Sequence, residues 1–186
     1  MNYESFLDKA NPHGWLLVAE NLFEQACELH RTKSAMIIHT DFRDGKRIER
    51  FTANRSMFLL GGFSLENAIK AFLVYENPGW LSNGQMSKRL RSHKLLELKN
   101  QSTKIPYPNK YDKTISAFED GLETWARYPC GLNFQDSGSE TLLNEQLWIR
   151  YENLMKAYIK RMEALLSVGW NGPNGYCCSF EFKKYA

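Results

Sequence analysis

Two charged residues, Glu66 and Lys70, stand four positions apart in a segment that is otherwise almost entirely apolar. On an exposed helix this i, i+4 pair would contribute only about 0.3–0.5 kcal/mol. On a buried helix each charge costs much more, unless a partner compensates for the lost water. We therefore expect either a closed network of paired charges, which is favoured, or a polar ligand-binding groove that also includes Arg55 on the same helix face.

A second candidate site is the densest basic segment, which holds five cationic or potentially cationic residues: Lys88, Arg89, Arg91, His93 and Lys94. Such a cluster can neutralise several phosphate groups. The neighbouring positive charges disfavour protonation of His93, so its neutral imidazole could act as a general base. A solvated basic loop is the simpler interpretation and is slightly favoured.

Other side chains suggest less chemistry. Arg127 and Tyr128 follow Trp125 where a helix is expected to end, so Arg127 is better explained by the helix dipole than by a ligand. The four histidines include no i, i+4 pair and the four cysteines form no C-x-x-C motif, so we predict no metal and no cofactor. The adjacent Cys177 and Cys178 have no basic neighbour to activate them, and their role stays open.

The periodicity of apolar residues predicts the elements that position these groups. Helices are expected from Asn11, which suits an N-cap, to about Leu29, and over 54–76, 93–99, 112–128 and 139–168. Residues 77–92 and 100–110 are expected to be connectors, and 169–186 an irregular or extended tail. The pattern therefore predicts an all-α, up-and-down bundle of four to five helices in one domain, 1–186.

The 54–76 helix is expected at the centre, because it is apolar on nearly every side. One stripe, Met57, Gly61, Ser64, Ala68 and Ala71, is mostly small and fits close packing within the chain or a dimer seam. The first helix pattern continues to Met36–Ile38, and Asp44-Gly45 then marks a turn. A hairpin across this turn is the weaker alternative.

Bulk composition indicates a globular protein, with 43% hydrophobic and 24% charged residues. The net charge of +3 is too small to predict nucleic-acid binding without local clustering. Because the sequence shows neither a signal-peptide pattern nor a long uninterrupted apolar run, we expect a cytoplasmic protein with reduced thiols and no membrane contact.

Three motifs resemble the HEPN-like family (higher eukaryote and prokaryote nucleotide-binding domains), in an uncharacterised bacterial subset. Residues 61–73, GGFSLENAIKAFL, resemble the family's G-x-x-L-E-N-x-x-K helix, and 92–98, SHKLLEL, resemble its G-H-D-L-x-x-L segment. Residues 125–129, WARYP, resemble its W-x-x-R-Y-P motif. The order and approximate spacing agree over residues 54–130.

The resemblance implies a helical homodimer that acts as an RNA- or nucleotide-associated binding or regulatory module, in phage defence or a toxin–antitoxin system with an antitoxin-type partner. Glu66 and Lys70 would then maintain a polar interior or ligand groove. The alternative is a metal-independent endoribonuclease with His93 as base and Arg89 or Arg91 stabilising the transition state. Related nucleases place four to six residues between the arginine and the histidine, whereas three separate Arg89 from His93 here, and Lys88 takes the position with four.

Overall fold

The computed structural model describes residues 3–32, 36–128 and 141–183. This part of the chain is mostly helical, which confirms the predicted all-α character. Its longer helices are α2 (Pro12–Thr32), α3 (Asn54–Glu76), α5 (Asp112–Glu123) and α6 (Glu145–Val168), and the shorter ones are α1 (Tyr3–Ala10) and α4 (Leu95–Lys99). Two 3₁₀ helices, Pro78–Gly84 and Lys88–Arg91, lie within the segment that was expected to be a plain connector.

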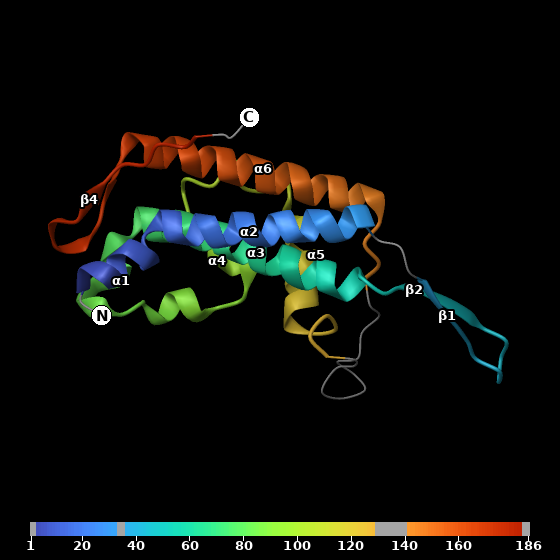
Figure 1. The fold of residues 1–186 in the computed structure, drawn as a ribbon. Helices are drawn as coiled ribbons and strands as arrows, with labels where there is room; N and C mark the ends of the chain where they lie inside the picture. Colours follow the sequence, from blue (N-terminus) through green and yellow to red (C-terminus); the bar gives the residue numbers. More distant parts are fainter. Residues whose placement is uncertain (1–2, 33–35, 129–140, 184–186) are drawn as a thin grey trace.

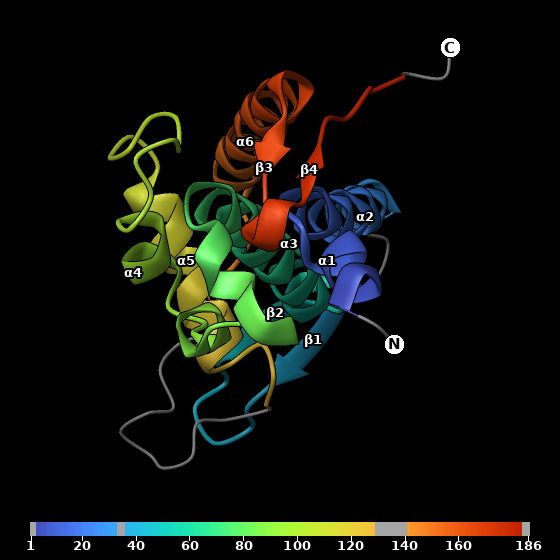
Figure 2. The same cartoon turned by 90° about the vertical axis from the view of Figure 1, so that its left-hand side faces the viewer.

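Helix α3 forms the centre of the bundle, with α2, α5 and α6 around it (Figure 2). Its bounds are those predicted, and most of its residues are buried, including Phe58, Leu65 and Phe72. By length and composition α3 could cross a membrane, but 78% of its most apolar stretch is buried inside the protein. This burial is that of a core helix, which needs to be apolar on all sides.

The small residues of α3 serve close packing within the chain. A Cβ on Gly61 would lie 2.5 Å from Phe118 Cε1 of α5 and 3.2 Å from Tyr151 Cζ of α6. On the side facing α2, the Ser64 hydroxyl donates a hydrogen bond of 2.8 Å to the carbonyl of Ala19. The stripe was expected to pack within the chain or to form a dimer seam. Contacts with neighbouring helices of the same chain account for Gly61 and Ser64.

The N-terminal region follows the prediction for α2 and adds one helix. Asn11 Oδ1 accepts a hydrogen bond of 2.9 Å from Gly14 N, which confirms Asn11 as the N-cap of α2. The preceding helix α1 was not expected, because its eight residues are too few to show a clear helical period. Leu7 and Ala10 of α1 are buried against the rest of the core.

Three predicted helix ends were wrong, and the smallest difference is in α4, which begins at Leu95 rather than 93. Helix α5 ends at Glu123 rather than Tyr128, because the chain turns there and buries Trp125 against Phe58, with ring centroids 4.7 Å apart. Pro129, which follows the predicted helix directly, lies outside the described residues. Helix α6 begins at Glu145 rather than 139, since Asn144 caps it by accepting a hydrogen bond of 2.8 Å from Leu147 N.

A buried asparagine accounts for the extended chain just before α6. Asn54, at the start of α3, donates to the carbonyl of Thr141 at 3.0 Å and accepts from Leu143 N at 3.0 Å. These bonds need backbone groups that a helix would use internally. The apolar periodicity carries no signal for such a contact.

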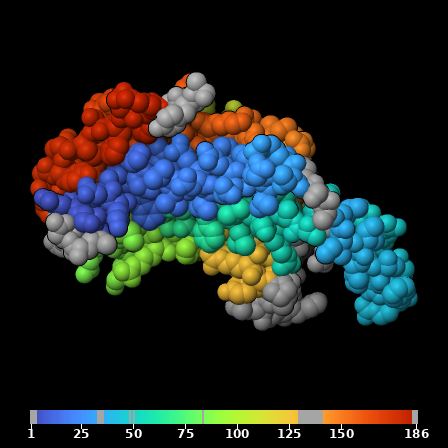
Figure 3. All heavy atoms as spheres, in the orientation of Figure 1, coloured from blue at the N-terminus to red at the C-terminus, as the bar shows by residue number. Residues whose placement is uncertain are grey.

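The favoured interpretation of residues 36–38 as a continuation of the helix is wrong. Strands β1 (Met36–Thr40) and β2 (Arg47–Phe51) form an antiparallel hairpin, with Met36 opposite Phe51 and Thr40 opposite Arg47. Consecutive β-branched residues such as Ile37 and Ile38 favour a strand, and Asp44-Gly45 supplies the turn. The hairpin projects away from the helical body (Figures 1 and 3).

After α6 the chain turns back at Gly169, whose φ of 121° suits glycine. Strands β3 (Trp170–Asn171) and β4 (Cys177–Cys178) then pair, and an extended segment follows, in agreement with the expected tail. His13 of α2 stacks on Phe180 of this segment, with centroids 4.6 Å apart. Burial lowers the pKa of His13, which favours the neutral form of the ring in this contact.

The close approach at Gly61 yields a stability test. Gly61→Ala should lower the free energy of unfolding, because overpacking costs about 1–3 kcal/mol and exceeds the gain in helix propensity. Chemical denaturation followed by circular dichroism measures the change. Gly79→Ala is the matched control, since its new Cβ would meet no atom within 4 Å. Equal stability of the two variants would contradict the packing described here.

Candidate functional site

Glu66, Lys70 and His93 form one hydrogen-bonded network. Lys70 Nζ donates to Glu66 Oε1 at 2.5 Å, and His93 Nδ1 lies 2.8 Å from Glu66 Oε2. The side chains of Glu66 and Lys70 are only 6% and 4% exposed, whereas that of His93 is 47% exposed. The two charges on α3 are thus sealed and paired, and His93 is the member of the network that reaches solvent.

Two short helices hold His93 in place. The 3₁₀ helix Lys88–Arg91 precedes it and is anchored by Leu90, which is 3% exposed. Helix α4 follows it and is anchored by buried Leu95 and by a hydrogen bond of 2.8 Å from Leu96 N to Glu119 Oε2 of α5. The position of His93 therefore depends on both flanking anchors as well as on Glu66.

The contact with Glu66 sets the orientation and tautomer of the imidazole. A carboxylate can only accept hydrogen bonds, so Nδ1 of His93 is the donor. In the neutral ring, Nε2 then carries the free lone pair and is the nitrogen available to a ligand. A histidine held in this way can accept a proton or bind a phosphate oxygen, depending on its charge.

The remaining residues of the basic segment are exposed and differ in their contacts. The Arg89 guanidinium lies over the ring of Trp80, 5.5 Å from its centroid, which restrains the side chain. Lys94 Nζ lies 3.4 Å from Glu97 Oε1, so part of its charge is balanced locally. Lys88 and Arg91 are exposed on the 3₁₀ helix that leads to His93. The segment thus presents several cations around one oriented histidine.

An apolar pocket of about 300 Å³ lies beside the network. Trp15 lines this pocket, and its ring also lies 5.7 Å from Lys70 Nζ. Asn67, next to Glu66 on α3, lines the pocket as well, and Met86, which precedes the basic segment, lies at its edge. Trp15 thus borders both the pocket and the ammonium group of the buried pair.

The other candidate residues gather elsewhere. Arg55 Nη1 donates to the carbonyl of Tyr128 at 2.5 Å, and Arg127 lies over the ring of Phe63, 5.5 Å from its centroid. Arg55 precedes Glu66 by 11 residues, which is about 16 Å along a helix. The expected grouping of Arg55 with Glu66 and Lys70 is therefore not the arrangement found, and Arg55 instead ties the segment that follows α5 to α3.

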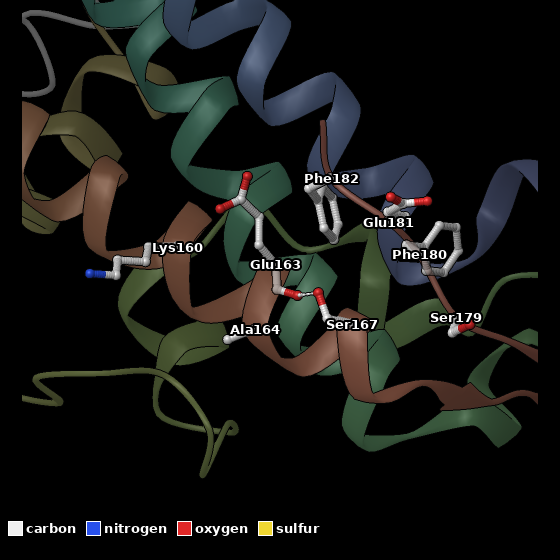
Figure 4. A pocket seen from close by; sticks show the side chains of 8 residues that line it. All are labelled: Lys160, Glu163, Ala164, Ser167, Ser179, Phe180, Glu181 and Phe182. Carbon is white, nitrogen blue, oxygen red and sulfur yellow. Dashed lines mark hydrogen bonds between the residues drawn. The ribbon is translucent and has the colours of Figure 1, made fainter. Parts of the chain in front are cut away.

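A larger pocket of about 690 Å³ lies between α6 and the C-terminal segment (Figure 4). Glu163 and Ser167 of α6 line it opposite Phe180 and Phe182. Burial, and then the nearby Glu163, raise the pKa of Glu20 on α2. Glu163, Glu181 and Lys160 all line this pocket, so its charges are mixed, in contrast to those of the basic segment.

Metal and thiol chemistry gain no support within the described residues. No group of three or more His, Cys, Asp or Glu among them is placed to hold a metal ion. The side chain of Cys177 is exposed, and burial raises the pKa of the adjacent Cys178. Burial also raises the pKa of Cys27 to about 11, with a smaller contribution from Glu152.

The sequence did not identify the aromatic partners of the site. Trp80 beneath Arg89 and Trp15 beside Lys70 come from segments that carried no motif. Tryptophan is a preferred partner for cations, and Trp80 lies nine residues before Arg89. Sequence offers no rule, however, for pairing one tryptophan with one cation across a connector.

Comparisons of the chain with known protein families, with curated proteins and with solved structures found no match.

The buried charges make a second stability test. Lys70→Met would leave the Glu66 carboxylate buried without its ammonium partner, and we expect a loss of about 3–5 kcal/mol in the free energy of unfolding. The double variant Glu66→Leu/Lys70→Met removes both charges and should be more stable than the single variant. Urea denaturation of the wild type and both variants measures the free energy of unfolding. A double variant less stable than Lys70→Met would show that the pair is not a closed unit.

Proposed function

We propose that this chain is a HEPN-like helical domain whose basic segment, residues 88–94, binds the phosphate groups of RNA or of a nucleotide. The observation that carries the proposal is the hydrogen bond between half-exposed His93 and buried Glu66. It joins two motifs of the family resemblance, 27 residues apart, in one contact. A contact between the two motifs supports their assignment to one family better than their spacing in the sequence alone.

The chemistry of the segment favours an anionic ligand. Lys88, Arg89 and Arg91 are exposed on a single turn, and Arg89 is already restrained by Trp80. Restrained cations lose less side-chain entropy when they bind a phosphate. In this proposal the Glu66–Lys70 pair does not itself touch the ligand; it fixes the histidine around which the cations lie.

The resemblance extends the proposal to the biological setting. We infer a cytoplasmic homodimer that acts as a binding or regulatory module in phage defence or a toxin–antitoxin system, with an antitoxin-type protein as a further partner.

RNA binding by the basic segment can be measured directly. Arg91→Ala should weaken the binding of a fluorescently labelled single-stranded RNA several-fold and lower the magnitude of the salt slope by about 0.7, the value for one phosphate contact. Fluorescence anisotropy between about 50 and 200 mM salt measures both. Arg161→Ala, which removes an exposed arginine from α6, is the matched control. Equal losses for the two variants would indicate a nonspecific effect of net charge.

The orientation of His93 favours metal-independent RNA cleavage as the second candidate function. With Nδ1 donating to Glu66, Nε2 could take the proton of a ribose 2′-hydroxyl. The 2′-oxygen would attack the adjacent phosphorus and form a 2′,3′-cyclic phosphate as the bond from phosphorus to the 5′-oxygen breaks. The released 5′-oxygen would take a proton from water. Arg89 or Arg91 would stabilise the charged phosphorane. This candidate uses the same surface but requires the RNA to reach Nε2.

Cleavage can be tested with single-stranded and structured RNA in the presence of a chelator. If His93 is the base, His93→Ala should reduce the rate by about 10²–10⁴-fold while the helical circular dichroism spectrum is retained. His39→Ala changes an exposed histidine on the hairpin and should leave the rate unchanged. Equal cleavage by wild type and His93→Ala would exclude His93 as the base, and no cleavage by any protein would leave RNA binding as the function.

A further inference from the structure

The β1–β2 hairpin extends from the helical body (Figure 3) and carries exposed apolar side chains. Every residue of β1 is exposed, including Ile37 at 59%, and Phe42 near the tip is 96% exposed. A two-stranded hairpin alone is at best marginally stable in water. Contiguous exposed apolar groups on such an element are typical of a surface that another chain covers.

The hydrogen-bond pattern shows which groups of β1 face outward. Asp41 N donates at 2.8 Å to the carbonyl of Lys46, the residue opposite it in the register. Because hydrogen-bonded and non-hydrogen-bonded pairs alternate along an antiparallel ladder, His39 and Ile37 also bond to β2. The N–H and C=O groups of Met36, Ile38 and Thr40 therefore point away from β2, to the edge of β1 that no other described strand pairs with.

The two edges of the hairpin differ in charge. Strand β2 contains Arg47, Glu49 and Arg50, and charged residues on an edge discourage pairing with another strand. Strand β1, with the sequence MIIHT, has no lysine, arginine, acidic residue or proline, and its pairing with β2 runs through all five residues in register. The edge of β1 thus lacks the features that protect an exposed strand.

We propose that β1 pairs antiparallel with β1 of a second copy of this chain, around a two-fold axis at Ile38. Met36 would then lie opposite Thr40 of the second copy, and the two hairpins would form one four-stranded sheet. All three outward-facing residues of β1 would be hydrogen-bonded in this register. The apolar side chains of Met36, Ile38 and Phe51, which share a face of the hairpin, would be continuous with their equivalents across the axis.

Charge favours a second copy over an anionic ligand at this surface. Residues 36–51 contain four basic and three acidic residues, so two hairpins approach with little repulsion. Two of these charges, Arg43 and Asp41, are already paired within the tip at 2.6 Å. In a dimer with a two-fold axis, the same residues of each chain form the interface, so no second surface patch is needed.

The oligomeric state of the full chain tests the proposal. Light scattering coupled to size-exclusion chromatography should give a dimer for wild type and a monomer for Ile38→Lys. The control Ile149→Lys makes the same change on α6 at a residue of similar exposure, 49% against 44%, and should remain dimeric. A monomeric wild type, or a dimer that persists in Ile38→Lys, would overturn the proposal.

A cysteine scan tests the register. Ile38→Cys should form an intermolecular disulfide between the two copies of residue 38, because the Cα atoms of a hydrogen-bonded pair lie about 5.5 Å apart, within the range of about 4.4–6.8 Å that a disulfide spans. Thr40→Cys should not link to its own equivalent, which lies away from the axis. Peptide mapping by mass spectrometry identifies the linked residues. Efficient linking of both variants would exclude this register.

This surface is separate from the basic segment. An Ile38→Lys protein that is monomeric and still binds RNA would leave the proposed RNA binding intact. A wild-type protein that is dimeric and binds no RNA would leave the proposed strand pairing intact.

Discussion

The Glu66 carboxylate is the constraint on which the arrangement of this molecule depends. It sits on a helix that is buried on nearly every side, so both of its oxygens need partners from inside the protein. Lys70 supplies one from the same helix, and His93 supplies the other from a connector 27 residues away. The second contact fixes the chain between α3 and α4, and with it the display of the basic residues. The Glu66 carboxyl group therefore links the pairing of buried charges in the core to the position of the basic segment on the surface.

The elements with a strong helical period could be predicted from the sequence. The bounds of α3 follow from its apolar residues and from Asn77-Pro78, and the start of α2 follows from Asn11. The ends of α5 and α6 could not be found in this way, because side chains from other elements set them. Trp125 turns away from the helix to pack on Phe58, and Asn54 takes the backbone groups of residues 141 and 143.

The candidate site was predicted in its residues but not in its geometry. Glu66, Lys70 and His93 were each identified, yet no spacing rule indicates that a histidine in a basic connector contacts a carboxylate on the central helix. The hairpin was also misjudged, because Met36–Ile38 continues the apolar period of the preceding helix while having residues that favour strands. Local patterns of this kind are ambiguous, and the tertiary contacts that resolve them involve residues distant in sequence.

The first two residues of α3 hold two distant parts of the chain together. Arg55 binds the carbonyl of Tyr128, and Asn54 binds the backbone of Thr141 and Leu143. The described chain on both sides of residues 129–140 is thus held by the first turn of α3. Two points that lie 13 residues apart in the sequence, 128 and 141, therefore share one anchor on the central helix.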